Sequence, residues 1–204
     1  MHRVTVDELR DLATLARVRI WDAAREYGRE PKIYLHWSAG HYNTKFEDYH
    51  VNIDSDGVCW MEHDLDTVLS HTFMRNSGAI GISLCCGYLA NTRDLGPEPP
   101  TAAQIEAMAQ AIVAVADGLW LTIDKWHVMT HGEAADNIDS LTAHEPYGPN
   151  NGCERWDLQY LGTEESPKFL CDHSDPRTGG NVLRGKANWY RICGKDKKDR
   201  SVIS

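Results

Sequence analysis

The sequence of 204 residues lacks any apolar run that approaches the roughly 18 residues needed to span a membrane. Its formal net charge is −9, and its longest basic block is the short segment GKDKKDR near the end. We therefore expect neither a membrane nor a nucleic acid as partner. The opening residues, MHRVTVDELRDL, contain no apolar h-region, so no conventional signal peptide is visible. We expect a protein that is made in the cytoplasm.

Cysteine is too sparse to hold the fold together through disulfide bonds. The chain has six cysteines and no CxxC pair, and it is long enough to bury a hydrophobic core without them. Cys85 and Cys86 are adjacent within an apolar run, which is typical of buried free thiols. The length and composition favour one domain with a sizeable core, with two small domains as the alternative.

Two segments have the periodicity of amphipathic helices. The first covers residues 5–28, with Thr5 as N-cap and Gly28 near the end. Its predicted buried stripe consists of Val6, Leu9, Leu12, Leu15, Val18 and either Ile20 or Trp21. The second helix is predicted to start after Thr101, with a stripe of Ile105, Met108, Ile112, Val115 and Leu119.

Short strand-like segments separate and follow these helices. KIYLHW is followed by a predicted hairpin over residues 48–62, in which DSDG forms the turn. AIGISLCC is typical of a central buried strand, and WHVMTH of another short strand. CERWDLQYL could open a last helix, and NVLRGKANWYRI is interpreted as a possible strand. The predicted fold class is α/β, a single domain with a central mixed β-sheet flanked by α-helices.

Two of the predicted strands end in a histidine, His36 in KIYLHW and His131 in WHVMTH. A single histidine at a strand end is usually structural, but two on neighbouring strands favour a metal site, because imidazole is the commonest zinc ligand. Cys153 and Asp157 lie further along and offer a thiol and a carboxylate. Two histidines and one of these groups would leave a fourth position open for water.

The order of several motifs resembles the zinc-dependent N-acetylmuramoyl-L-alanine amidases, a family that includes amidase-type phage lysozymes and the peptidoglycan recognition proteins. The resemblance runs from about residue 32 to 161, and it implies the fold of that family. It rests on YLHWSAG, YHVNIDSDG, SHTFMRNSGAIGIS, TAAQIEAM, VMTHGE and CERWDL. We therefore expect an N-terminal helix over 1–30, a zinc amidase domain over 31–161, and an extension over 162–204 packed on the same domain.

The resemblance implies a zinc ion bound by His36, His131 and Cys153, with Asp157 as the alternative third ligand. Tyr49 and Glu133 are the expected catalytic residues. Tyr49 would stabilise a developing oxyanion, and Glu133 would orient a ligand.

Substrate-binding roles fall to His71 and Asn76 by the same resemblance. Two polar positions depart from the family pattern. Ser83 stands where some members have glutamate, and Asn151 stands where others have a lysine, two residues before Cys153.

The resemblance implies hydrolysis of the amide between N-acetylmuramic acid and L-alanine in peptidoglycan or muropeptides. A phage or prophage endolysin, released to the wall by a holin or a similar route, would need no signal peptide. A non-catalytic peptidoglycan-binding module is the alternative. A cysteine peptidase using Cys85 or Cys86 is disfavoured, because neither lies at a helix N-terminus that would lower the pKa of its thiol.

Overall fold

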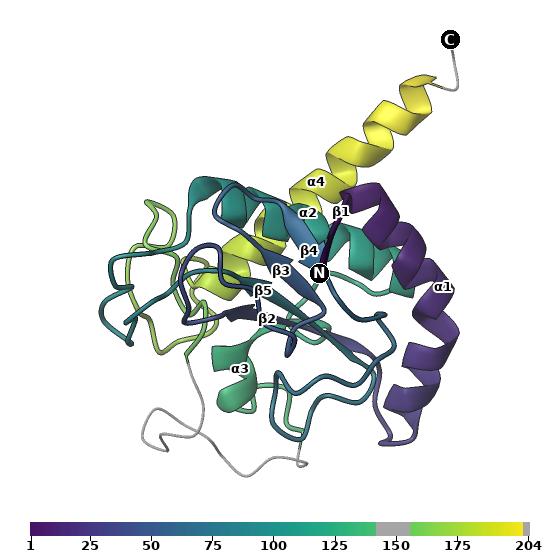
Figure 1. Ribbon diagram of the computed structural model, residues 1–204, viewed down its shortest axis with the longest axis horizontal. Coiled ribbons are helices and arrows are strands. Elements are labelled where there is room, and N and C mark those ends of the chain that lie inside the picture. The colour runs from purple at the N-terminus through teal and green to yellow at the C-terminus, as the bar shows by residue number, and fades with distance from the viewer. Residues whose placement is uncertain (142–155, 202–204) are drawn as a thin grey trace.

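The computed structural model describes residues 1–141 and 156–201, and these residues fold around one six-stranded mixed sheet (Figure 1). The strand order is β1-β4-β3-β5-β2-β6. β3, β5, β2 and β6 are parallel, and β4 pairs antiparallel with β1 and with β3. The strands are β1 (His2–Val4), β2 (Lys32–Trp37), β3 (Val51–Ile53), β4 (Cys59–Met61), β5 (Ala79–Leu84) and β6 (Val128–Thr130). The predicted α/β class with a mixed sheet is confirmed, and β1 is a strand that the sequence patterns did not predict.

The helices are α1 (Val6–Arg25), α2 (Ala102–Leu119), α3 (His131–Ala135) and α4 (Gly179–Ser201). Thr5 and Thr101 each form a capping box with the side chain three residues further on, which accounts for the predicted starts of α1 and α2. Among the described residues, no helix combines the length and apolar character that a membrane crossing requires.

The buried face of α1 differs from the predicted stripe. Leu15 and Val18 are 73% and 66% exposed, whereas the buried residues are Leu9, Ala13, Ala16, Ile20 and Ala24. The cause is close packing against α2, where a Cβ added to Gly118 would lie only 2.5 Å from the Ala13 Cβ. Small side chains permit this approach, so helix packing outweighs the apolar period.

Successive residues of the central strands face opposite sides of the sheet. Ile33 and Leu35 of β2 belong to the main core, to which α1, α2 and α4 also contribute. Tyr34 belongs instead to a small cluster that includes Ala134 of α3. His36 has the same parity as Tyr34, so it lies on the side of the sheet that α3 and the β4–β5 loop (residues 62–78) cover.

The C-terminal part of the chain corrects two predictions. NVLRGKANWYRI is not a strand but lies within α4, and Leu183 and Ala187, four residues apart, enter the main core. Residues four apart lie on the same face of a helix, so this face of α4 packs on the core. The described part of CERWDLQYL, residues 156–161, is not helical. The C-terminal end of α4 extends away from the rest of the protein (Figure 1).

Candidate metal centre

Three buried side chains converge where the parallel strands end. His36 is the fifth residue of β2, and His131 immediately follows the neighbouring parallel strand β6. Their Nδ1 atoms lie 3.1 Å apart, and each lies 3.3 Å from Oδ2 of Asp157. The exposed fractions of the three residues are 0%, 6% and 0%. Within the part of the chain that the structure describes, these two histidines and one aspartate are the group that could hold a metal ion.

The spacing of these atoms fits a tetrahedral zinc site. Zinc binds imidazole nitrogen and carboxylate oxygen at about 2.1 Å, so neighbouring ligand atoms around a tetrahedral ion are about 3.4 Å apart. The observed separations of 3.1, 3.3 and 3.3 Å are close to that value. Two neutral imidazoles and one carboxylate also suit zinc chemically, and three protein ligands leave one position for water. The alternative ligand Asp157 therefore lies with both histidines, while Cys153 lies outside the described residues.

The β4–β5 loop holds the far side of the His36 ring. Thr72 Oγ1 lies 3.4 Å from His36 Nε2 and 3.0 Å from His71 Nδ1. The Thr72 backbone N–H donates to Asn76 Oδ1 over 2.8 Å. Metal-binding histidines commonly use their second ring nitrogen in this way, which fixes ring orientation. The structure thus places Asn76 where its carboxamide supports Thr72.

His71 and Tyr49 both pack against His36. The ring centroid of Tyr49 lies 5.0 Å from that of His36, and the centroid of His71 lies 5.4 Å from it. His71 is only 6% exposed, and burial together with the neighbouring histidines lowers its pKa well below the usual value. Tyr49 is therefore beside the candidate metal centre, as the resemblance implies, and His71 forms part of the buried support around it.

Glu133 occupies a different kind of position. Thr130 caps α3, and the Glu133 carboxylate accepts a hydrogen bond from the Thr130 backbone N–H over 2.9 Å. Both carboxylate oxygens also accept from the guanidinium of Arg184 in α4. Glu133 thus stabilises the helix whose first residue is His131.

His50 is a buried histidine that sequence reasoning did not single out, although it belongs to the YHVNID segment. Its Nδ1 accepts from the Gly81 backbone N–H over 3.0 Å, and its Nε2 donates to the Thr67 carbonyl over 2.8 Å. Since Nδ1 must accept, only the neutral ring fits. Burial lowers the pKa of His50 to about 4.

Acid will therefore destabilise the fold through His50. Between about pH 6.5, the usual value in an unfolded chain, and about pH 4, the unfolded state binds the extra proton. The free energy of unfolding should fall by about 3 kcal/mol across this range and then level off. Urea unfolding at a series of pH values measures the slope. His50→Gln should remove this component, and a slope equal to that of wild type in this variant would contradict the assignment.

Cys85 and Cys86 are both fully buried. Burial raises the pKa of Cys85 to about 12 and that of Cys86 well above its usual value. Both thiols therefore stay protonated at neutral pH, which argues against a cysteine nucleophile.

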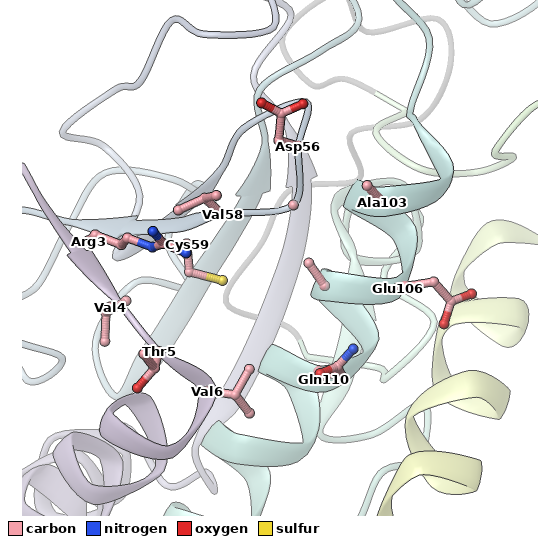
Figure 2. Close-up of a pocket in the computed structure, with 12 residues that line it drawn as sticks. Arg3, Val4, Thr5, Val6, Asp56, Val58, Cys59, Ala103, Glu106 and Gln110 are labelled. Carbon is pink, nitrogen blue, oxygen red and sulfur yellow. The ribbon is translucent and has the colours of Figure 1, made fainter.

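A separate cavity of about 360 Å³ lies between β1, the β3–β4 turn and α2 (Figure 2). Its lining includes Arg3, Asp56 and Glu106. Figure 2 shows Glu106 pointing toward α4 and away from the other two side chains, and its carboxylate binds Lys186 and Tyr190 of that helix. The polar groups of this cavity do not converge, and none of the predicted site residues lines it.

The fold and the buried triangle define a class of protein, an α/β domain with a candidate histidine–carboxylate metal centre at the ends of parallel strands. Residues 19–148 match the model of the family "N-acetylmuramoyl-L-alanine amidase" (Amidase_2), and the chain belongs to this family. The family predicted from the ordered motifs is thus confirmed.

Among solved structures, the chain is similar to "Endolysine N-acetylmuramoyl-L-alanine amidase LysCS from Clostridium intestinale URNW". The sequence identity is 19% and the TM-score 0.39, and the likeness covers 50% of this chain and 68% of that one. No curated protein matches the sequence.

Proposed function

We propose that this protein hydrolyses the amide bond between N-acetylmuramic acid and L-alanine in peptidoglycan, with zinc held by His36, His131 and Asp157. One observation carries the proposal. In a chain of the amidase family, two imidazole nitrogens and one carboxylate oxygen form a buried triangle with the spacing of zinc ligands.

Each residue around the triangle has a task in this reaction. When bound, zinc would supply a water molecule whose pKa is lowered to about 7 and would polarise the scissile carbonyl. Tyr49, beside His36, is the proposed donor to the carbonyl oxygen as negative charge develops there. Thr72 and Asn76 keep the His36 ring in orientation, and Glu133 does the same for the helix that begins at His131.

Assigning Asp157 as third ligand also changes one departure from the family pattern. The residue two positions before Asp157 is Arg155, whereas Asn151 stands two positions before Cys153. Some family members have lysine at that place, and arginine preserves its positive charge. We propose Arg155 as the cation that assists the developing oxyanion, on the basis of its place in the sequence.

The proposed function is tested on purified peptidoglycan by measuring new L-alanine N-termini. We expect release by the wild-type protein, loss of release with a zinc chelator, and recovery when zinc is returned. Tyr49→Phe should retain zinc but lower kcat about 100-fold, because it removes one donor to the oxyanion. Binding of peptidoglycan without release would support the recognition module instead, and release that resists the chelator would contradict the zinc assignment. The endolysin role and release by a holin stay predictions.

A further inference from the structure

The first turn of α4 contacts two of the segments that carry candidate metal ligands, the one with Asp157 and the one with His131. A Cβ added to Gly179 would lie 2.0 Å from the backbone oxygen of Leu158, the residue directly after Asp157. The Gly179 N–H also donates to the Gln159 carbonyl over 3.0 Å. These contacts leave no room for a side chain at position 179, and they hold the backbone next to Asp157 against the start of the helix.

Gly180 makes the equivalent contact with the other segment. A Cβ at this position would lie 2.7 Å from Glu133 Oε1 and 2.9 Å from Glu133 Cδ. A carboxylate beside the first turn of a long helix also benefits from the positive end of the helix dipole. The two glycines therefore place the start of α4 between the Asp157 segment and the His131 segment.

Arg184, one turn further along α4, strengthens the second contact. Its Nη1 donates to Glu133 Oε2 over 2.8 Å, and its Nη2 donates to Glu133 Oε1 over 2.6 Å. The side chains are 6% and 1% exposed, so the pair is a buried bidentate ion pair. Nη1 also donates to the Val128 carbonyl of β6 over 2.7 Å.

Glu133 transmits this restraint to His131. Its carboxylate accepts from the Thr130 N–H, and its own N–H donates to Thr130 Oγ1, so His131 lies between two residues of a capping box. Fixing the Glu133 carboxylate therefore fixes the turn from which the His131 side chain extends.

We propose that the start of α4 fixes the position of His131 relative to Asp157, with Gly180 and Arg184 as positioning residues for metal binding. The start of α4 lies beyond residues 19–148, the part that the family model matches. The inference depends on the proposed function only in taking His131 and Asp157 as ligands.

Two glycines of α4 provide a matched test. Alanine at either position should favour the helix, because glycine is a poor helix former. A Cβ at Gly185 meets nothing within 4 Å, whereas a Cβ at Gly180 would displace a carboxylate that Arg184 and Thr130 hold in place. We expect Gly185→Ala to raise the thermal midpoint and keep zinc affinity. Gly180→Ala should weaken zinc binding about 10- to 100-fold, the usual effect of disturbing the support of a ligand.

A second pair of variants tests the ion pair itself. Arg184→Lys keeps the charge but loses the bidentate geometry, and we expect it to weaken zinc binding about tenfold. Lys186→Met is the control, because Lys186 joins α4 to Glu106 of α2 and does not contact the His131 segment. Competition with a chromogenic chelator gives the zinc dissociation constants, and the visible spectrum of the Co²⁺-substituted protein reports the geometry of the site.

Wild-type zinc affinity and Co²⁺ spectrum in both Gly180→Ala and Arg184→Lys would overturn the proposal, and so would an equal loss of affinity in Gly185→Ala or Lys186→Met. A different measurement tests the proposed function independently of the role of α4. A wild-type protein that binds zinc but releases no L-alanine N-termini would refute the amidase assignment while the affinities still decide the role of α4.

Discussion

Asp157→Asn will strip zinc from the protein and abolish amidase activity, whereas Cys153→Ser will change neither. The Asp157 carboxylate lies 3.3 Å from each of the two histidine Nδ1 atoms, and asparagine would replace it with a neutral amide of the same size. A neutral amide is a poor zinc ligand beside two imidazoles. Metal-assisted stabilisation of the transition state is worth several kcal/mol, so we expect a loss of kcat/KM of about a thousandfold or more.

Metal content by atomic absorption and release of L-alanine N-termini measure the two effects in parallel. His36→Ala is the positive control, because His36 is a candidate ligand under either assignment. Thermal unfolding of the zinc-free proteins separates a missing ligand from a damaged fold, since a folded Asp157→Asn protein should keep a cooperative unfolding transition. Loss of zinc in Cys153→Ser with retention in Asp157→Asn would show that the thiol is the third ligand.

His36 and His131 could be predicted because strand geometry brings them together. Both follow apolar runs, and β2 and β6 are neighbouring parallel strands, so their C-terminal residues meet at one edge of the sheet. The helix starts at Thr5 and Thr101 could be predicted for a similar reason, since a capping box is a local feature.

The third candidate ligand could not be chosen from the sequence, because Cys153 and Asp157 both lie in CERWDL and only the fold brings the Asp157 carboxylate beside the two histidines. The backbone next to Asp157 contacts the start of α4, and nothing near CERWDL indicates that contact. Arg184 is 51 residues from its partner Glu133, and a lone arginine gives no sign of burial until its carboxylate is known. The buried face of α1 also depends on a contact distant in sequence, because close packing with Gly118 favours alanine at the interface and leaves Leu15 and Val18 exposed.

A second large effect is expected at Asp139, which lies beside Lys32 at the start of β2. Its carboxylate lies 2.7 Å from Arg75 Nη1 and 3.1 Å from Lys32 Nζ, and the side chains of Asp139 and Arg75 are 1% and 0% exposed. Burial alone would raise the pKa of Asp139, but the bonds to Arg75 and Lys32 outweigh it and the pKa is lowered. Asp139 lies in the segment that follows His131, and its ion pair connects this segment to Arg75 in the β4–β5 loop. Arg75 is three residues after Thr72.

Asp139→Asn should lower the free energy of unfolding by about 3–5 kcal/mol, because it leaves Arg75 and Lys32 buried without their carboxylate. Urea unfolding at pH 7 measures the change. Asp7→Asn is the matched control, since Asp7 pairs with Arg10 at 2.6 Å but is 89% exposed, and it should cost less than about 1 kcal/mol. Because the Asp139 pKa is lowered on folding, its contribution is present at neutral pH and lost as pH falls below about 4. The difference between wild type and Asp139→Asn should therefore shrink in acid, and a difference that persists unchanged there would assign the stability to packing instead.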